Sequence, residues 1–230
     1  MTDPIPTGCD AVDDLLGGGF ERGAVTQVYG PPAAGKTNLV LSAAMEVAAA
    51  GQSALYIDTE GLSLDRLEQL AAGHGRENQT VDDLASRIII TDAMSFEEQQ
   101  EAVQDAAEFA DRVDYIVLDS ATGFYRLRRT EQADGETLRS VARQITHLLS
   151  LARKHDLAVA FTNQVFTDPE SDQARALGGH TLDHWSGVIL RLDRFRGGNR
   201  RATLEKHHAR ETGDTGQFRI VETGLADANR

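Results

Sequence analysis

The chain has a single cysteine, Cys9, so no internal disulfide can form, and this usage is typical of proteins in a reducing cytosol. It also lacks any run of 18 apolar residues, which argues against a transmembrane helix. Residues 1–6 carry neither the basic segment nor the apolar stretch of a secretory signal peptide. These absences predict a cytoplasmic protein that does not associate with a membrane.

Lysine is scarce, because only three of the 23 basic residues are lysines: Lys36, Lys154 and Lys206. The formal net charge is −13, so acids are in large excess. An acidic, lysine-poor chain is typical of halophilic proteins, and an ordinary acidic cytosolic protein is the alternative. In 1 M salt the Debye length is roughly 3 Å, so any contact with DNA has to depend on close pairs of groups.

Strand-like and helix-like segments alternate along the chain and predict the fold class. Apolar strands are expected at 24–29, 53–58, 87–91, 114–119 and 157–162, and an amphipathic helix at 135–154. Residues 187–195 and 200–206 alternate in polarity around a Gly-Gly-Asn turn, which predicts a hairpin, and 217–221 adds a strand. Residues 121–134 and 165–177 are expected to be irregular. The pattern predicts one α/β domain over residues 1–230, with a mostly parallel central sheet flanked by helices and antiparallel strands at the C-terminal edge.

Residues 30–37, Gly-Pro-Pro-Ala-Ala-Gly-Lys-Thr, match the P-loop pattern G-x-x-x-x-G-K-[ST] between an expected strand and an expected helix. Backbone amides and the helix N-terminus would hold the phosphates of ATP, Lys36 would face the β- and γ-phosphates, and the Thr37 hydroxyl would ligate Mg²⁺. The alternative is a glycine-rich turn that binds nothing. The predicted ATP-binding residues are Gly30, Pro31, Pro32, Ala33, Ala34, Gly35, Lys36, Thr37 and Asn38.

Three more polar residues are expected at the carboxyl ends of parallel strands, where α/β sheets bind ligands. Asp119 ends an apolar strand and is predicted to hold Mg²⁺ together with Thr37. Glu60 follows the second strand, where its carboxylate could orient or deprotonate water, and Gln164 could sense the γ-phosphate. A solvated strand end is the alternative for each acid. The predicted catalytic residues are therefore Lys36, Glu60 and Gln164.

Further motifs resemble the core of the RecA-type recombinase family, in its archaeal RadA/RadB branch. The most specific are Asp-Thr-Glu-Gly at 58–61 and Thr-Asn-Gln-Val at 162–165, together with Leu-Asp-Ser-Ala-Thr at 118–122. The resemblance spans nearly the whole chain and implies a RecA-like P-loop ATPase core. It implies that Glu60 activates water and that Gln164 links the nucleotide to the DNA-binding loops. It also suggests that Arg66 lies near the adenine and that Lys206 acts across a subunit boundary.

By the same resemblance, residues 121–134 correspond to the first DNA-binding loop and 165–177 to the second. The first loop suits base stacking and phosphate contact on single strands, and its alternative is a solvated loop whose aromatics cap the core. The second loop carries acids at 168, 170 and 172, where a phosphate grip needs cations. No helix-hairpin-helix domain is expected before the core. The predicted DNA-binding residues are Tyr125, Arg126, Arg128 and Arg129.

Together these features predict an ATP-binding, DNA-binding recombination and repair accessory protein with weak Mg²⁺-dependent ATPase activity and little or no strand exchange. Single-stranded DNA and a RadA-type recombinase are the expected partners, with a junction-processing nuclease and self-association as further candidates. The alternative is a KaiC-like signalling ATPase that acts on protein partners without DNA. A scaffold whose nucleotide only orders an interface is a third hypothesis.

Overall fold

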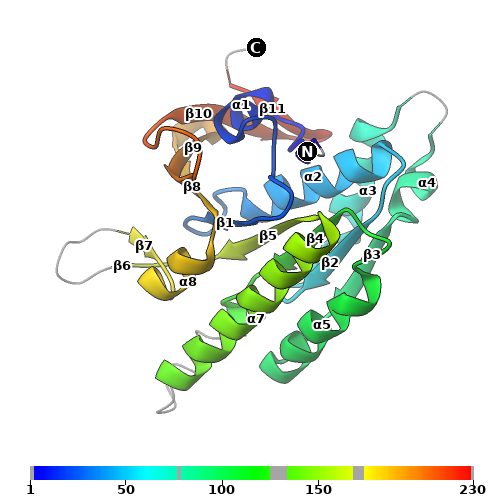
Figure 1. Ribbon diagram of the computed structural model, residues 1–230. Coiled ribbons are helices and arrows are strands. Elements are labelled where there is room, and N and C mark those ends of the chain that lie inside the picture. The colour runs from blue at the N-terminus through cyan, green and yellow to red at the C-terminus, as the bar shows by residue number, and fades with distance from the viewer. Residues whose placement is uncertain (1–2, 77–78, 125–133, 168–173, 229–230) are drawn as a thin grey trace.

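The computed structural model describes residues 3–76, 79–124, 134–167 and 174–228 (Figure 1). These residues include a nine-stranded sheet in the order β11-β10-β9-β8-β1-β5-β4-β2-β3 and a small sheet of β6 and β7. The strands of the large sheet are β1 (Val25–Tyr29), β2 (Ala54–Asp58), β3 (Ile88–Asp92), β4 (Tyr115–Asp119), β5 (Ala158–Asn163), β8 (Val188–Arg194), β9 (Asn199–Lys206), β10 (Thr215–Val221) and β11 (Gly224–Asp227).

The parallel half of the sheet brings four strand ends to one edge. Strand β1 pairs in parallel with both β5 and β8, and β4 lies between β5 and β2. Tyr29 is opposite Asn163, and Asp58 is opposite Asp119, so these four strands end level with one another. Every residue of β1, β2, β4 and β5 is buried, which explains why they are nearly continuous apolar runs in the sequence.

The C-terminal part of the sheet is antiparallel, which confirms the predicted fold class. Strands β8 and β9 form the expected hairpin across the short 3₁₀ turn Arg196–Gly198, and β10 and β11 continue the sheet outward. The prediction of irregular structure over 165–177 is wrong in part, because β6 (Val165–Thr167) pairs antiparallel with β7 (Ala174–Ala176). The sequence patterns do not predict strand β11 or the short helix α4 (Val81–Ala85).

Helices cover both faces of the sheet, and α5 and α7 run side by side on one of them (Figure 1). Buried residues of α1 to α4 join one core cluster, whereas those of α5, α7 and α8 join the other. In the described part of the chain, no helix is both long and apolar enough to span a membrane. The helices are α1 (Asp10–Leu16), α2 (Lys36–Ala49), α3 (Leu64–His74), α4 (Val81–Ala85), α5 (Phe96–Phe109), α7 (Asp134–His155) and α8 (Gly179–Trp185).

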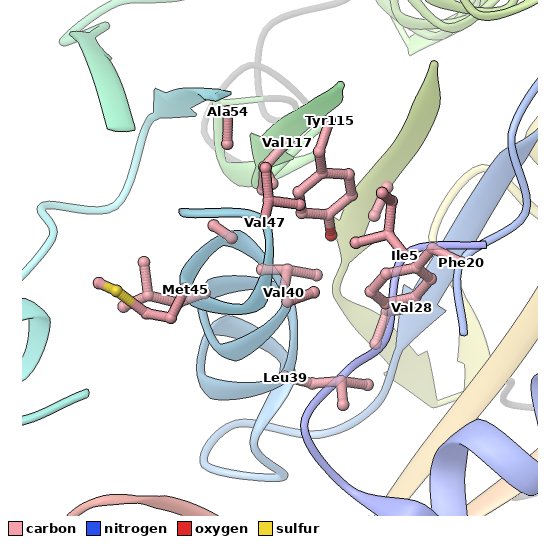
Figure 2. Packing of buried hydrophobic residues seen from close by; sticks show 14 of the residues in the cluster. Ile5, Phe20, Val28, Leu39, Val40, Met45, Val47, Ala54, Tyr115 and Val117 are labelled. Carbon is pink, nitrogen blue, oxygen red and sulfur yellow. The ribbon is translucent and has the colours of Figure 1, made fainter. Parts of the chain in front are cut away.

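The core beneath α2 ties the N-terminal segment to the centre of the sheet (Figure 2). The Phe20 ring stacks on the Tyr115 ring of β4 with centroids 5.6 Å apart, and both residues are fully buried. Figure 2 shows Val40 of α2 in the same cluster, on the side of the helix that faces these rings. Burying one such large side chain contributes about 1.5–3 kcal/mol, so this cluster fixes the position of α2 and of the loop before it.

A close approach between α3 and the β10–β11 turn gives a test of this packing. A Cβ added at Gly73 would lie 2.0 Å from the carbonyl oxygen of Thr223. Gly73→Ala therefore forces the backbone of α3 away from the backbone of the β10–β11 turn. We expect a net loss of about 1–2 kcal/mol after the gain in helix propensity, which lowers the melting temperature by roughly 3–6 °C. Gly135→Ala is the matched control, because no described atom outside its chain neighbours and the backbone of α7 lies within 4 Å of its added Cβ. Equal melting temperatures for the two variants would contradict the contact.

Candidate nucleotide-binding site

The segment 30–37 lies between the end of β1 and the start of α2, as a P-loop requires. Gly35 caps α2 with a φ of 103°, a conformation that residues with a Cβ rarely adopt. Gly30 packs against the neighbouring strand so closely that a Cβ there would lie 2.2 Å from the carbonyl oxygen of Leu192 in β8. The loop is therefore supported by both its own strand and β8.

Lys36 is the first residue of α2 and its ammonium turns back over the loop. It donates to the carbonyl oxygens of Gly30 at 3.0 Å and Pro31 at 3.2 Å. Burial lowers the pKa of Lys36, and the carboxylates of Glu60 and Asp119 oppose that shift. A cation at a helix N-terminus, partly withdrawn from water, is well placed to bind phosphate oxygens.

A cleft of about 470 Å³ opens above this loop, within the usual size range of small-molecule sites. Its lining unites residues from three separate predicted motifs: Gly30, Pro32, Ala33, Gly35, Lys36, Thr37, Asn38, Glu60, Gln164 and Val165. A larger groove of about 1250 Å³ lies elsewhere, between α1 and the β9–β10 connection. Six carboxylates and one guanidinium line that groove, so its charge would repel a triphosphate.

Asp119 is buried at the end of β4 and receives hydrogen bonds from two neighbouring strands. The Tyr56 hydroxyl of β2 donates to its Oδ2 at 2.6 Å, and the Thr162 hydroxyl of β5 donates to its Oδ1. Burial raises the pKa of Asp119, while the hydroxyls of Thr162, Tyr56 and Thr37 lower it. The carboxylate thus lies within hydrogen-bond reach of the Thr37 hydroxyl. The two groups offer the oxygen ligands that Mg²⁺ prefers, so these residues fit the ion.

Glu60 is presented by a tight turn that the side chain of Asp58 organises. One Asp58 oxygen accepts from the backbone amides of Glu60 at 3.0 Å and Gly61 at 3.1 Å. The Glu60 Oε1 atom accepts from Ser120 Oγ at 2.8 Å and from Gln164 Nε2 at 3.0 Å. The structure therefore brings Glu60 and Gln164 into direct contact, and it adds Ser120, which the motifs alone did not single out.

Arg66 lies beside the cleft rather than in its lining. Its Nε donates to Asn38 Oδ1 at 2.8 Å, and its other nitrogens donate to the backbone carbonyls of Val221 at 3.0 Å and Glu222 at 2.6 Å. These bonds tie α3 to the β10–β11 turn and orient Asn38. Contact between Arg66 and adenine stays a prediction. In the structure, Arg66 is connected to the cleft through its hydrogen bond to Asn38, which lines it.

The predicted DNA-contacting residues Tyr125, Arg126, Arg128 and Arg129 lie outside the described residues, as do the acids of the second loop. Just before them, Phe124 packs against the core cluster of α5 and α7, which agrees with the capping alternative for that one aromatic. Lys206 donates to the carbonyl oxygen of Asp183 at 2.7 Å within its own chain. Because this contact lies within one chain, the predicted role of Lys206 across a subunit boundary stays a prediction.

Comparison with known proteins agrees with this geometry. The Rad51 family model matches residues 3–228. A DNA repair and recombination protein RadB from Halobacterium salinarum is 60% identical over 228 residues, covering 98% of this chain and 95% of that protein. A RadB protein from Methanococcoides burtonii is 41% identical over 227 residues, covering 98% of each chain.

A crystal structure of the RadB recombinase superposes with a TM-score of 0.82 at 35% sequence identity, covering 97% of this chain and 99% of that one. The likeness to a Halobacterium protein also fits the acidic, lysine-poor composition. The chain therefore belongs to the Rad51 family of RecA-type recombinases, in its RadB branch.

Proposed function

We propose that the protein is a recombination and repair accessory that binds ATP with Mg²⁺, hydrolyses it slowly and contacts single-stranded DNA through residues 121–134. One observation carries the proposal. Glu60 lines the same cleft as Lys36 and Thr37, and its Oε1 accepts from Ser120 and Gln164, which stand directly before the two segments that correspond to the family's DNA-binding loops. Relatives named as DNA repair and recombination proteins support the repair role.

The proposed chemistry is in-line attack of water on the γ-phosphate. The amides of the loop and Lys36 would hold the β- and γ-phosphates, and the Glu60 carboxylate would orient the water and accept its proton. Thr37 and Asp119 would hold Mg²⁺, which would neutralise part of the phosphate charge. Glu60 Oε1 already accepts two hydrogen bonds, which leaves Oε2 to orient water, and Lys36 already donates two of its three ammonium protons to carbonyls. Lys36 must therefore give up at least one of these carbonyls before it can contact both phosphates. This requirement supports slow turnover.

The proposal also includes partners. A RadA-type recombinase, a junction-processing nuclease and further copies of this chain are the candidates, in keeping with a family that acts in recombination. Size-exclusion chromatography with light scattering, with and without ATP and DNA, measures self-association directly. A mass of one chain, 25.0 kDa, under all four conditions would remove the homo-oligomer from the proposal.

For DNA binding, we expect Arg126→Ala combined with Arg128→Ala to weaken affinity for a single-stranded oligonucleotide by about tenfold or more, because two phosphate contacts are lost. Fluorescence anisotropy at matched salt gives the affinity. Arg76→Ala combined with Arg112→Ala removes the same charge from exposed positions elsewhere and serves as the control. Equal affinity of the first double variant and the wild type would remove residues 121–134 from the DNA site.

A gel shift with single-stranded DNA in molar KCl separates this proposal from a KaiC-like signalling ATPase. We expect a shift that grows with ATP. ATP hydrolysis without any shift would favour the signalling alternative, and a shift without measurable turnover would favour a scaffold.

A further inference from the structure

The two segments that correspond to the family's DNA-binding loops, 121–134 and 165–177, share a buried junction. Thr122, at the start of the first segment, is fully buried, and so is Asn163 at the end of β5. The Thr122 Oγ1 atom donates to Asn163 Oδ1 at 2.8 Å and accepts from the backbone amide of Gln164 at 3.2 Å. One hydroxyl thus uses both its donor and an acceptor position to join the two segments.

The same junction extends to the far end of the second segment. Asn163 Nδ2 donates to the carbonyl oxygen of Leu177 at 2.8 Å, and the amide of Leu177 donates to the carbonyl oxygen of Gln164 at 2.9 Å. The amide of Ala121 donates to the carbonyl oxygen of Thr162 at 3.0 Å. Both ends of the β6–β7 pair and the start of the first segment are therefore bonded to each other within a few residues.

This junction is connected to the candidate catalytic carboxylate at two points. Glu60 Oε1 accepts from Ser120, two residues before Thr122, and from the side chain of Gln164, whose backbone amide donates to Thr122. A change of hydrogen-bond partner at Glu60 thus acts on both segments at once. Without the Thr122 hydroxyl bonds, the loss of the two hydrogen bonds to Glu60 would remove the side-chain connection between the segments.

We infer that Thr122 is a positioning residue that joins the first residues of both segments into one unit, so that the nucleotide acts on both segments together when it changes the affinity for DNA. The inference rests on the proposed function for the role of the segments, and it assigns a task to Thr122 that neither catalysis nor nucleotide binding requires. Thr122 is absent from the lining of the cleft, and the hydroxyl contacts only the junction among the described residues.

The test compares Thr122→Val with Thr122→Ser. Valine keeps the shape but leaves Asn163 Oδ1 and the Gln164 amide without a partner, whereas serine keeps the hydroxyl. The measured quantity is the ratio of oligonucleotide affinities with and without a non-hydrolysable ATP analogue. Coupling factors between linked sites are roughly 5–150, and we expect Thr122→Val to reduce the wild-type ratio to about 2 or less, with Thr122→Ser close to wild type. Affinity for the analogue itself should stay within about twofold.

Thr146→Val is the control, because the Thr146 hydroxyl donates only within α7, to the carbonyl oxygen of Arg143 at 2.9 Å. A full wild-type ratio in Thr122→Val, or a wild-type ratio of 1, would overturn the inference while leaving DNA binding intact. If the wild type bound no DNA, the proposed function would fail instead. The role of Thr122 would then be tested by amide hydrogen exchange. The analogue should then slow exchange at both 121–124 and 174–177 in the wild type, and at only one of them in Thr122→Val. An equal response at both in the variant would overturn the inference.

Discussion

Lys36→Ala should abolish useful nucleotide binding, weakening the affinity for a fluorescent ATP analogue by about 100-fold. Charge-assisted hydrogen bonds contribute about 1.5–3 kcal/mol each, and every 1.4 kcal/mol changes the dissociation constant tenfold. Lys36 stands at the N-terminus of α2. It is the only lysine or arginine in the described lining of the cleft. No other described residue of that lining carries a positive charge.

Lys154→Ala is the control for Lys36→Ala, since it removes the same charge from an exposed position near the end of α7. Its affinity for the analogue should equal that of the wild type. The melting temperature of Lys36→Ala without nucleotide shows whether the loop tolerates losing the bonds to the carbonyls of Gly30 and Pro31. A folded variant that still bound the analogue normally would show that the triphosphate does not lie against this loop.

Glu60→Gln should reduce the turnover of ATP by a factor of roughly 10² to 10⁴ and leave ATP affinity nearly unchanged, because a positioned general base contributes that much. Glutamine has nearly the same size, and its amide oxygen can still accept from Ser120 Oγ, so the turn after β2 is preserved. Single-turnover phosphate release, measured with saturating ATP and Mg²⁺, separates the chemical step from binding.

Glu101→Gln, on an exposed position of α5, changes the same functional group away from the cleft and should keep wild-type turnover. If Glu60→Gln also hydrolysed ATP at close to the wild-type rate, another group would have to activate the water. Glu60 would then be a structural partner of Ser120 and Gln164.

Periodicity and motif spacing predict much of this fold. Strands buried on both faces are continuous apolar runs, so β1, β2, β4 and β5 are visible in the sequence, and the Gly-Gly-Asn turn identifies the β8–β9 hairpin. The β6–β7 pair is missed because strands of three residues have too few positions to show alternation. Helix α4 is missed because five residues complete little more than one turn, although Thr80 and Asp83 form a capping box.

How much of the candidate site the sequence predicts is limited by a different factor, the order of the strands in the sheet. The motifs name Lys36, Glu60 and Gln164, and these three do line one cleft. Tyr56 and Thr162 contact Asp119 only because β4 lies between β2 and β5, and a single sequence does not reveal which strands are neighbours. Thr122 and Asn163 meet for the same reason, at the ends of adjacent strands.

The contact between Gly30 and the backbone of β8 means that the phosphate loop and a strand about 160 residues later depend on each other. No side chain fits between them, so any insertion that displaced β8 would also displace the loop. A chain cut before Val188 would keep every residue of the loop motif and lose the surface on which the loop rests. Transplanting this loop into another scaffold would therefore require an equally close neighbouring strand.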